Sequence, residues 1–107
     1  MYAVIRKFNK MRSVDEAARR AADGLGPILQ QSKGFVGYYV VRFGEGSGGS
    51  ITLFDSQQTA QDAQANAMTW IKGNLSDLTE GEPEVWSGEV LAAVTGQTTS
   101  GGRATAA

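Results

Sequence analysis

The chain has 107 residues, of which 41% are hydrophobic and 20% are charged, and its formal net charge is −1. This length predicts a single domain with one modest core. Cysteine and histidine are both absent from the sequence. Their absence excludes disulfides, thiolate nucleophiles and zinc-finger ligands, and it removes the commonest general base, metal ligand and haem ligand.

Charge is distributed unevenly between the two halves of the chain. Residues 1–43 carry eight basic and three acidic groups, whereas residues 44–107 carry two basic and eight acidic groups. A nucleic-acid footprint on the basic half is the weaker interpretation, because the whole chain has no positive field. We expect a cytoplasmic protein without a membrane partner, since no apolar run is long enough for a signal peptide or a membrane span. The basic footprint would consist of Arg6, Lys7, Lys10 and Arg12.

The first half of the chain shows a strand pattern followed by a helix pattern. Residues 2–8 are aromatic and β-branched, as is typical of a strand. Ser13 and Glu16 have the spacing of a capping box, so a helix is predicted to begin there. Apolar residues then recur at helical spacing as far as Leu29. The segment Gly24–Pro27 interrupts this stripe, and its proline predicts a bend or break.

The second half begins with the clearest strand, over residues 35–43. The glycine-rich run 44–50 is predicted to be a loose hairpin loop, too long for a tight two-residue turn, leading into a short strand over 51–54. A second helix is predicted to begin at Asp55, with Gln58 at the capping-box position, and to end near residues 72–74. These signals predict a hairpin followed by a long helix.

A last strand is predicted over residues 85–94, which completes the order β-α-β-β-α-β. That order predicts an α+β fold, the ferredoxin-like sandwich, in which an antiparallel sheet carries both helices on one face. The domain is expected to cover residues 1–94. The polar tail 95–107 lacks the composition for a core and is predicted to be disordered.

The strands are apolar on both faces, which a sheet with one solvated face would not be. Strict alternation along 35–43 places Phe35, Tyr39, Val41 and Phe43 on one face and Val36, Tyr38 and Val40 on the other. Two helices cover only one face, and leaving the second exposed would cost many kcal/mol. Packing against a second copy, sheet to sheet, is the favoured solution, and a tail folded back over the sheet is the alternative.

Two junctions resemble a known family. They are the segment Gly34-Phe35-Val36-Gly37-Tyr38, between the first helix and the second strand, and the segment Phe54-Asp55-Ser56 at the entry to the second helix. With the order of elements, they resemble the antibiotic biosynthesis monooxygenase-like proteins of the dimeric α/β-barrel superfamily, over about residues 1–94. The resemblance implies a homodimer in which two sheets face each other as a dimeric α/β barrel. It also implies a small cleft between helices and sheet in each chain.

Asn66 and Trp70 lie one turn apart on the second predicted helix and therefore share a face. The resemblance implies that an asparagine and a tryptophan on this helix line the cleft, where they bind and orient a phenolic substrate as tentative catalytic residues. The tyrosine or arginine that such enzymes add near the cleft is not found in the stretch after Trp70. The alternative is that Trp70 packs in the core and Asn66 is solvated.

Four further residues are candidates for substrate binding, namely Tyr38, Tyr39, Arg42 and Trp86. The two tyrosines point to opposite faces of one strand, so one of them could reach the cleft while the other meets a partner chain. Trp86 more plausibly anchors the core or an interface than stacks on a ligand. Arg6 and Arg42 interrupt apolar strands; each either pairs with Glu84 or Glu89 on the last strand or binds a carboxylate or enolate in the cleft.

The favoured function is a homodimer that binds a small hydrophobic or aromatic molecule. If it is an enzyme, it is a cofactor-independent monooxygenase or isomerase of phenols or quinones. This chemistry requires no cofactor and no metal. Haem degradation is disfavoured because the family members that perform it ligate iron through histidine, which this sequence lacks. The alternative is a non-catalytic module of the same fold that binds a ligand or a protein.

Overall fold

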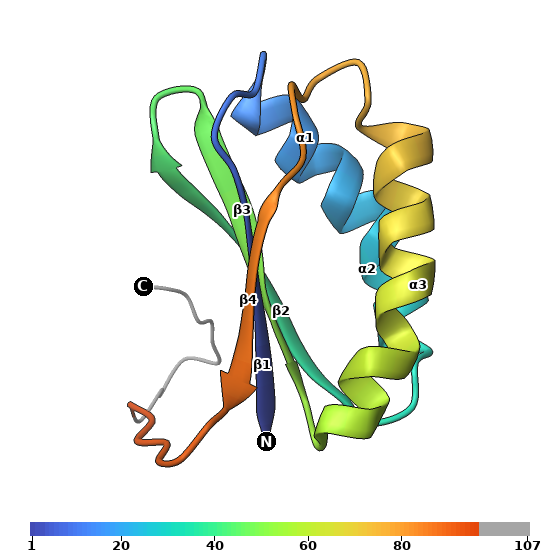
Figure 1. The fold of residues 1–107 in the computed structure, drawn as a ribbon, viewed down its shortest axis with the longest axis vertical. Helices are drawn as coiled ribbons and strands as arrows, with labels where there is room; N and C mark the ends of the chain where they lie inside the picture. Colours follow the sequence, from blue (N-terminus) through green and yellow to red (C-terminus); the bar gives the residue numbers. More distant parts are fainter. Residues whose placement is uncertain (97–107) are drawn as a thin grey trace.

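The computed structural model describes residues 1–96 and contains one four-stranded sheet with helices on one side of it (Figure 1). All strand pairs are antiparallel, and the strand order is β2-β3-β1-β4. This arrangement confirms the predicted ferredoxin-like α+β fold. The elements are β1 (Tyr2–Phe8), α1 (Val14–Arg20), the π-helical turn η1 (Ala21–Leu25), α2 (Gly26–Gln30), β2 (Phe35–Gly44), β3 (Ser47–Phe54), α3 (Gln57–Asn74) and β4 (Glu84–Glu89).

The first helix begins at the predicted cap. The Ser13 hydroxyl accepts a hydrogen bond from the Glu16 amide at 3.1 Å, which satisfies one free N–H of the first turn. The Glu16 carboxylate pairs with the guanidinium groups of Arg19 and Arg20, at 2.6 and 2.9 Å. These two cations hold the pKa of Glu16 down at about 2.

The predicted interruption of this helix takes the form of a π-helical turn between α1 and α2. The amide of Gly26 reaches back five residues to the carbonyl of Ala21. Pro27 lies in the first turn of α2, where its missing N–H costs little. The wider turn therefore lets the chain pass the proline without ending the helical layer.

The glycine-rich run is not the loose loop predicted from its composition. β3 already begins at Ser47, and only the tight turn Glu45-Gly46 connects it to β2, with Gly46 at a φ of +73°. A Cβ on Gly48 would lie 2.9 Å from Val14 Cγ1, and one on Gly49 would lie 1.8 Å from the carbonyl oxygen of Arg6. These glycines are needed because other chain segments approach them closely inside the sheet.

Two other predicted boundaries also differ. The cap of α3 is Ser56, one residue after the predicted Asp55, and Ser56 forms a reciprocal capping box with Thr59. The helix ends at Asn74, within the predicted range. β4 ends at Glu89 instead of Val94 because Glu89 lies opposite Tyr2, the first residue of β1, so no neighbouring strand continues beyond it.

Residues 90–96 have no regular structure. Most of the predicted disordered tail, residues 97–107, lies outside the described residues.

The core lies between the helices and what we call the covered face of the sheet. Its strands alternate cleanly, so β1 directs Val4, Arg6 and Phe8 toward the helices. The buried core residues are Val4, Phe8, Ala17, Leu25, Leu29, Phe54, Ala60, Ala63, Ala67, Ile71, Leu75 and Leu78.

No helix of residues 1–96 lies over the opposite side, here called the open face (Figure 1). Three aromatic side chains are substantially exposed there: Tyr39 is 58% exposed, Trp86 52% and Phe43 44%. The strand register assigns the following apolar residues to this face: Ala3, Ile5, Tyr39, Val41, Ile51, Leu53 and Trp86. Phe43 lies in a second register shift, and its ring is under the ammonium of Lys7, which belongs to the same face.

Phe35 was predicted to lie on the same face as Tyr39, but it does not. A register shift between Phe35 and Gly37 inserts an extra residue into β2, so Phe35 lies opposite Phe54. The rings of Phe35 and Phe54 meet edge to face with centroids 6.1 Å apart, against the core. The bulge therefore moves Phe35 from the open face to the covered face.

Candidate functional site

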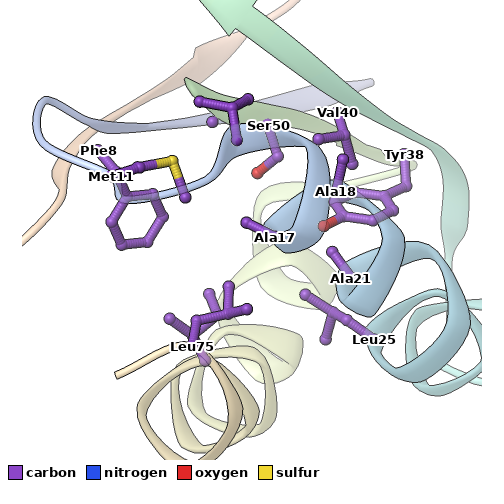
Figure 2. Close-up of a pocket in the computed structure, with 13 residues that line it drawn as sticks. Phe8, Met11, Ala17, Ala18, Ala21, Leu25, Tyr38, Val40, Ser50 and Leu75 are labelled. Atoms are coloured by element: carbon purple, nitrogen blue, oxygen red, sulfur yellow. The ribbon is translucent and has the colours of Figure 1, made fainter. Parts of the chain in front are cut away.

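An apolar hollow lies between the helices and the covered face of the sheet, and we call it the inner hollow (Figure 2). Its enclosed part is about 30 Å³, enough for a few waters and well below the volume of a small-molecule site. The residues lining it are Phe8, Met11, Val14, Ala17, Ala18, Ala21, Leu25, Tyr38, Val40, Gly49, Ser50, Ile71 and Leu75.

Tyr38 is the main polar side chain of the inner hollow. β2 positions it opposite Thr52, so its ring lies on the covered face, and Figure 2 shows the ring beside Ala18 and Ala21. Burial raises the pKa of Tyr38 to about 12, although the nearby guanidinium of Arg6 lowers it somewhat. The phenol is therefore neutral at pH 7 and can donate a hydrogen bond to a ligand.

Arg6 lies deeper in the fold, at the centre of β1. Only 2% of it is exposed, and its Nη2 donates a short hydrogen bond to Oε1 of Gln64 on α3. Its Nε is buried without a hydrogen-bond partner among the described residues. Burial lowers the pKa of Arg6. A second hollow borders this group, with an enclosed volume of about 10 Å³, and Leu25 lines both hollows.

The predicted pairing of the strand arginines with Glu84 or Glu89 is wrong. Glu84 lies opposite Lys7 and so projects to the other face from Arg6, which lies opposite Val85. Arg42 is on β2, at the far edge of the sheet from β4, and its exposed guanidinium pairs with Asp15 at the start of α1.

Asn66 and Trp70 both lie on α3, as predicted, but the structure gives them different surroundings. Asn66 is exposed. Trp70 is partly buried, and its indole packs against η1, where a Cβ on Gly24 would lie 2.6 Å from Cζ2. Neither residue lines the inner hollow. Their role in catalysis stays a prediction.

The remaining candidates separate by face. Tyr38 and Tyr39 point to opposite sides of the sheet, as expected from their adjacent positions, and only Tyr38 lines the inner hollow. Trp86 lies opposite Ile5 and therefore on the open face. Of the four predicted substrate contacts, only Tyr38 thus reaches the inner hollow in one chain.

The link between Arg6 and Gln64 was not predicted, because 58 residues separate them in the sequence. One signal for it existed. Arg6 alternates along β1 with Val4 and Phe8, so all three side chains lie on the same face of the strand. Gln64 lies beside the buried Ala60, Ala63 and Ala67 on α3. Each polar residue thus interrupts an apolar pattern at a position that faces inward.

The described part of the chain contains no cluster of three metal-ligating carboxylates. Within the same residues, no helix has the length and hydrophobicity to cross a bilayer. The two hollows together offer five polar side chains to a ligand: the Arg6 guanidinium, the Gln64 amide, the Tyr38 phenol and the hydroxyls of Ser50 and Thr52.

Comparison of the fold with solved structures shows what it is similar to. SnoaB, a cofactor-independent oxygenase from Streptomyces nogalater, superposes with a TM-score of 0.70 at 14% identity, over 87% of this chain and 95% of its own. The chain has the fold of the antibiotic biosynthesis monooxygenase-like proteins. The ActVA-Orf6 monooxygenase of Streptomyces coelicolor, in complex with nanaomycin D, has a TM-score of 0.69 at 14% identity over 90% of this chain and 92% of its own.

A protein of unknown function from Nitrosomonas europaea, NE2512, superposes with a TM-score of 0.71 at 18% identity, over 91% of this chain and 95% of its own. No protein-family model and no curated protein matches the sequence. The similarity is therefore one of fold, at identities of 12–18%.

Proposed function

We propose that the protein binds a small aromatic molecule in the inner hollow and oxidises it as a cofactor-independent monooxygenase of phenols or quinones. The observation that carries this proposal is the apolar hollow between helices and sheet, with the neutral phenol of Tyr38 at its wall, in a fold shared with SnoaB and ActVA-Orf6. A ligand larger than a few waters requires the inner hollow to widen, because its enclosed part is small.

The chemistry follows from what such a site supplies. A phenol or anthrone in its electron-rich form can donate electrons directly to dioxygen. One oxygen atom then enters the ring system, the other leaves as water, and the substrate loses two hydrogens. The protein contributes shape, exclusion of water and hydrogen bonds to the developing charge on oxygen. We assign Tyr38 to hydrogen bonding of the substrate oxygen. Asn66 and Trp70 lie outside the inner hollow, and their contribution is a separate prediction.

Pairing of two copies through the open face is part of the same proposal. Three exposed aromatic residues and several branched side chains lie on this face, and covering them would stabilise the protein at about 25 cal/mol per Å². A two-fold axis would bring identical open faces together. Sedimentation velocity at micromolar concentration tests this directly: a dimer mass is expected, and a stable folded monomer would contradict it.

Oxygen uptake tests the enzymatic part. Wild-type protein, with anthrone or a dihydroxynaphthalene, is expected to consume oxygen above the spontaneous rate and to release the quinone. Tyr38→Phe should slow the reaction, and Trp70→Phe and Asn66→Ala test the two predicted residues. Tyr39→Phe is the matched control, since the neighbouring phenol lies on the other face. Equal rates in the wild type and in Tyr38→Phe would refute the role of Tyr38.

A second function is favoured by one observation: the predicted catalytic pair does not line the inner hollow. A non-catalytic module that only binds the aromatic ligand would not need Asn66 or Trp70 there. Native mass spectrometry of the purified protein distinguishes the two. A retained aromatic ligand together with no oxygen uptake would support the non-catalytic module.

A further inference from the structure

A buried cation without an anion is the least explained feature of the covered face. Arg6 has one protein partner for its guanidinium, the uncharged amide of Gln64, and its Nε has none among the described residues. A buried charge is normally paired, because removing it from water costs several kcal/mol that only a counter-ion or several hydrogen bonds offset.

Within residues 1–96 no carboxylate supplies such a counter-ion. All eleven carboxylate side chains of the sequence lie within residues 1–96, and none of the five ion pairs in that segment includes Arg6. The contrast with the helix surface is direct: carboxylates raise the pKa of Arg19 and Arg20, whereas burial lowers that of Arg6 and only the Tyr38 phenol opposes this. That phenol is neutral at pH 7 and supplies no charge.

The surroundings of Arg6 have the donors that an anionic ligand needs. The residues lining the small hollow beside it are Arg6, Leu25, Leu29, Thr52, Phe54, Ala63, Gln64 and Ala67, an apolar wall with three polar side chains. Leu25 lines both hollows and separates them, and the Tyr38 phenol of the inner hollow is near enough to Arg6 for the guanidinium to act on it. A ligand that reaches past Leu25 would therefore meet the guanidinium. The planar fork of arginine donates two parallel hydrogen bonds, which matches the geometry of a carboxylate.

We propose that Arg6 is an anion-binding residue of the cleft and that the natural ligand is an aromatic carboxylate. Its carboxylate would accept hydrogen bonds from the guanidinium, and its ring would occupy the inner hollow beside Leu25. This proposal rests on the proposed function, since it uses the same hollow, and it adds the charge and the polar group of the ligand.

The test compares three probes by titration calorimetry at pH 7: 2-naphthoate, the neutral isostere 2-naphthamide, and the phenol 2-naphthol. We expect 2-naphthoate to bind the wild type at least about tenfold more tightly than 2-naphthamide, as hydrogen bonds to a charged group imply. Arg6→Met should remove that preference while leaving 2-naphthol binding within about threefold. If the wild type binds 2-naphthoate no more tightly than 2-naphthamide, the carboxylate proposal is overturned.

Unfolding without ligand distinguishes a binding role from a structural one. A buried charge without a counter-ion lowers stability by more than one hydrogen bond to a neutral amide restores, so Arg6→Met is expected to raise the midpoint of urea unfolding. A lower midpoint together with unchanged 2-naphthoate binding would assign Arg6 to structure and overturn the proposal.

Gln64→Glu is the second variant and keeps Arg6 in place. It supplies the missing anion from α3, so 2-naphthoate affinity should fall about tenfold or more while 2-naphthol still binds. Unchanged 2-naphthoate affinity in Gln64→Glu would overturn the proposal. Binding of 2-naphthol alone would leave the proposed aromatic site intact and refute the carboxylate, whereas failure of all three probes would refute both.

Discussion

Each face of the sheet departs from the usual distribution of polar and apolar side chains. In most antiparallel sheets the face under the helices is apolar and the face toward water is polar. Here the covered face buries Arg6, Ser50 and Thr52, while the open face exposes Tyr39 and Trp86.

The two faces differ in what they leave unsatisfied: a buried polar atom on the covered face and exposed apolar side chains on the open face. The covered face holds more polarity than packing needs, since the Nε of Arg6 has no acceptor in the described part of the chain. The open face leaves three aromatic side chains, Tyr39, Phe43 and Trp86, exposed by 44–58%. We propose a ligand for the covered face and a second copy of the chain for the open face. Substitutions on the covered face should therefore change stability and ligand binding, and substitutions on the open face should change association.

The largest expected effect is on the covered face. Leu25 is fully buried and lines both hollows, so Leu25→Ala should lower the free energy of unfolding by about 2–5 kcal/mol, through lost burial and the cavity it leaves. Urea unfolding measures it. Leu91→Ala is the control, since Leu91 is 88% exposed, and should change stability by less than about 0.5 kcal/mol. A loss below about 1 kcal/mol at Leu25 would show that this layer is loosely packed.

The next effect is on the open face and concerns association. Ile51 lies at the centre of that face, paired with both Ile5 and Tyr39. Ile51→Lys would bury two unpaired ammonium groups in a symmetric dimer, so the dissociation constant should rise about 100-fold or more. Sedimentation equilibrium measures the change.

The control for this variant is Gln61→Lys on the exposed side of α3, which adds the same charge away from the sheet. It should leave the dissociation constant unchanged. If Ile51→Lys sediments as the wild type does, two copies of the chain do not pair through the open face.

A third effect tests how closely the helical layer fits together. The indole of Trp70 occupies the space beside Gly24, so Gly24→Ala should cost about 1–3 kcal/mol by overpacking. Gly26 lies two residues away, where a Cβ would come no nearer than 3.8 Å to Ala21 O, so Gly26→Ala should be neutral or stabilise the helix by up to about 1 kcal/mol. Equal effects of the two variants in urea unfolding would contradict this packing.

Local signals account for most of what the sequence predicted correctly. The order of elements, the Ser13 cap and the end of α3 depend on residues within one turn of each other, and all are confirmed. The bend near Pro27 was also predictable, because a missing N–H is a property of that residue alone, although the π-helical form of the bend was not.

What the sequence did not reveal depends on distant neighbours. Gly49 is needed because the Arg6 carbonyl approaches it, and nothing next to Gly49 in the sequence indicates that. The bulge after Phe35 shifts one aromatic residue between faces, since a single inserted residue changes the alternation. The contact of Arg6 with Gln64 joins β1 to α3, so it could be found only once both elements were placed.

The smallest expected effect is the pH dependence of stability that comes from ionisation of the Tyr38 phenol on the covered face. Burial holds the pKa of Tyr38 at about 12, against an ordinary value of 10.0. Between these two values the folded state retains a proton that the unfolded state releases, so this residue's contribution to stability is present below pH 10 and is lost as pH rises toward 12. In Tyr38→Phe this part of the pH dependence should disappear, whereas Tyr39→Phe on the open face should retain it. Tyrosinate absorbance near 295 nm, followed from pH 9 to 12.5, reports the same event as a late ionisation step of one phenol. A wild-type curve without that late step would show that water reaches Tyr38 freely, and the covered face would then differ less from the open face than its burial indicates.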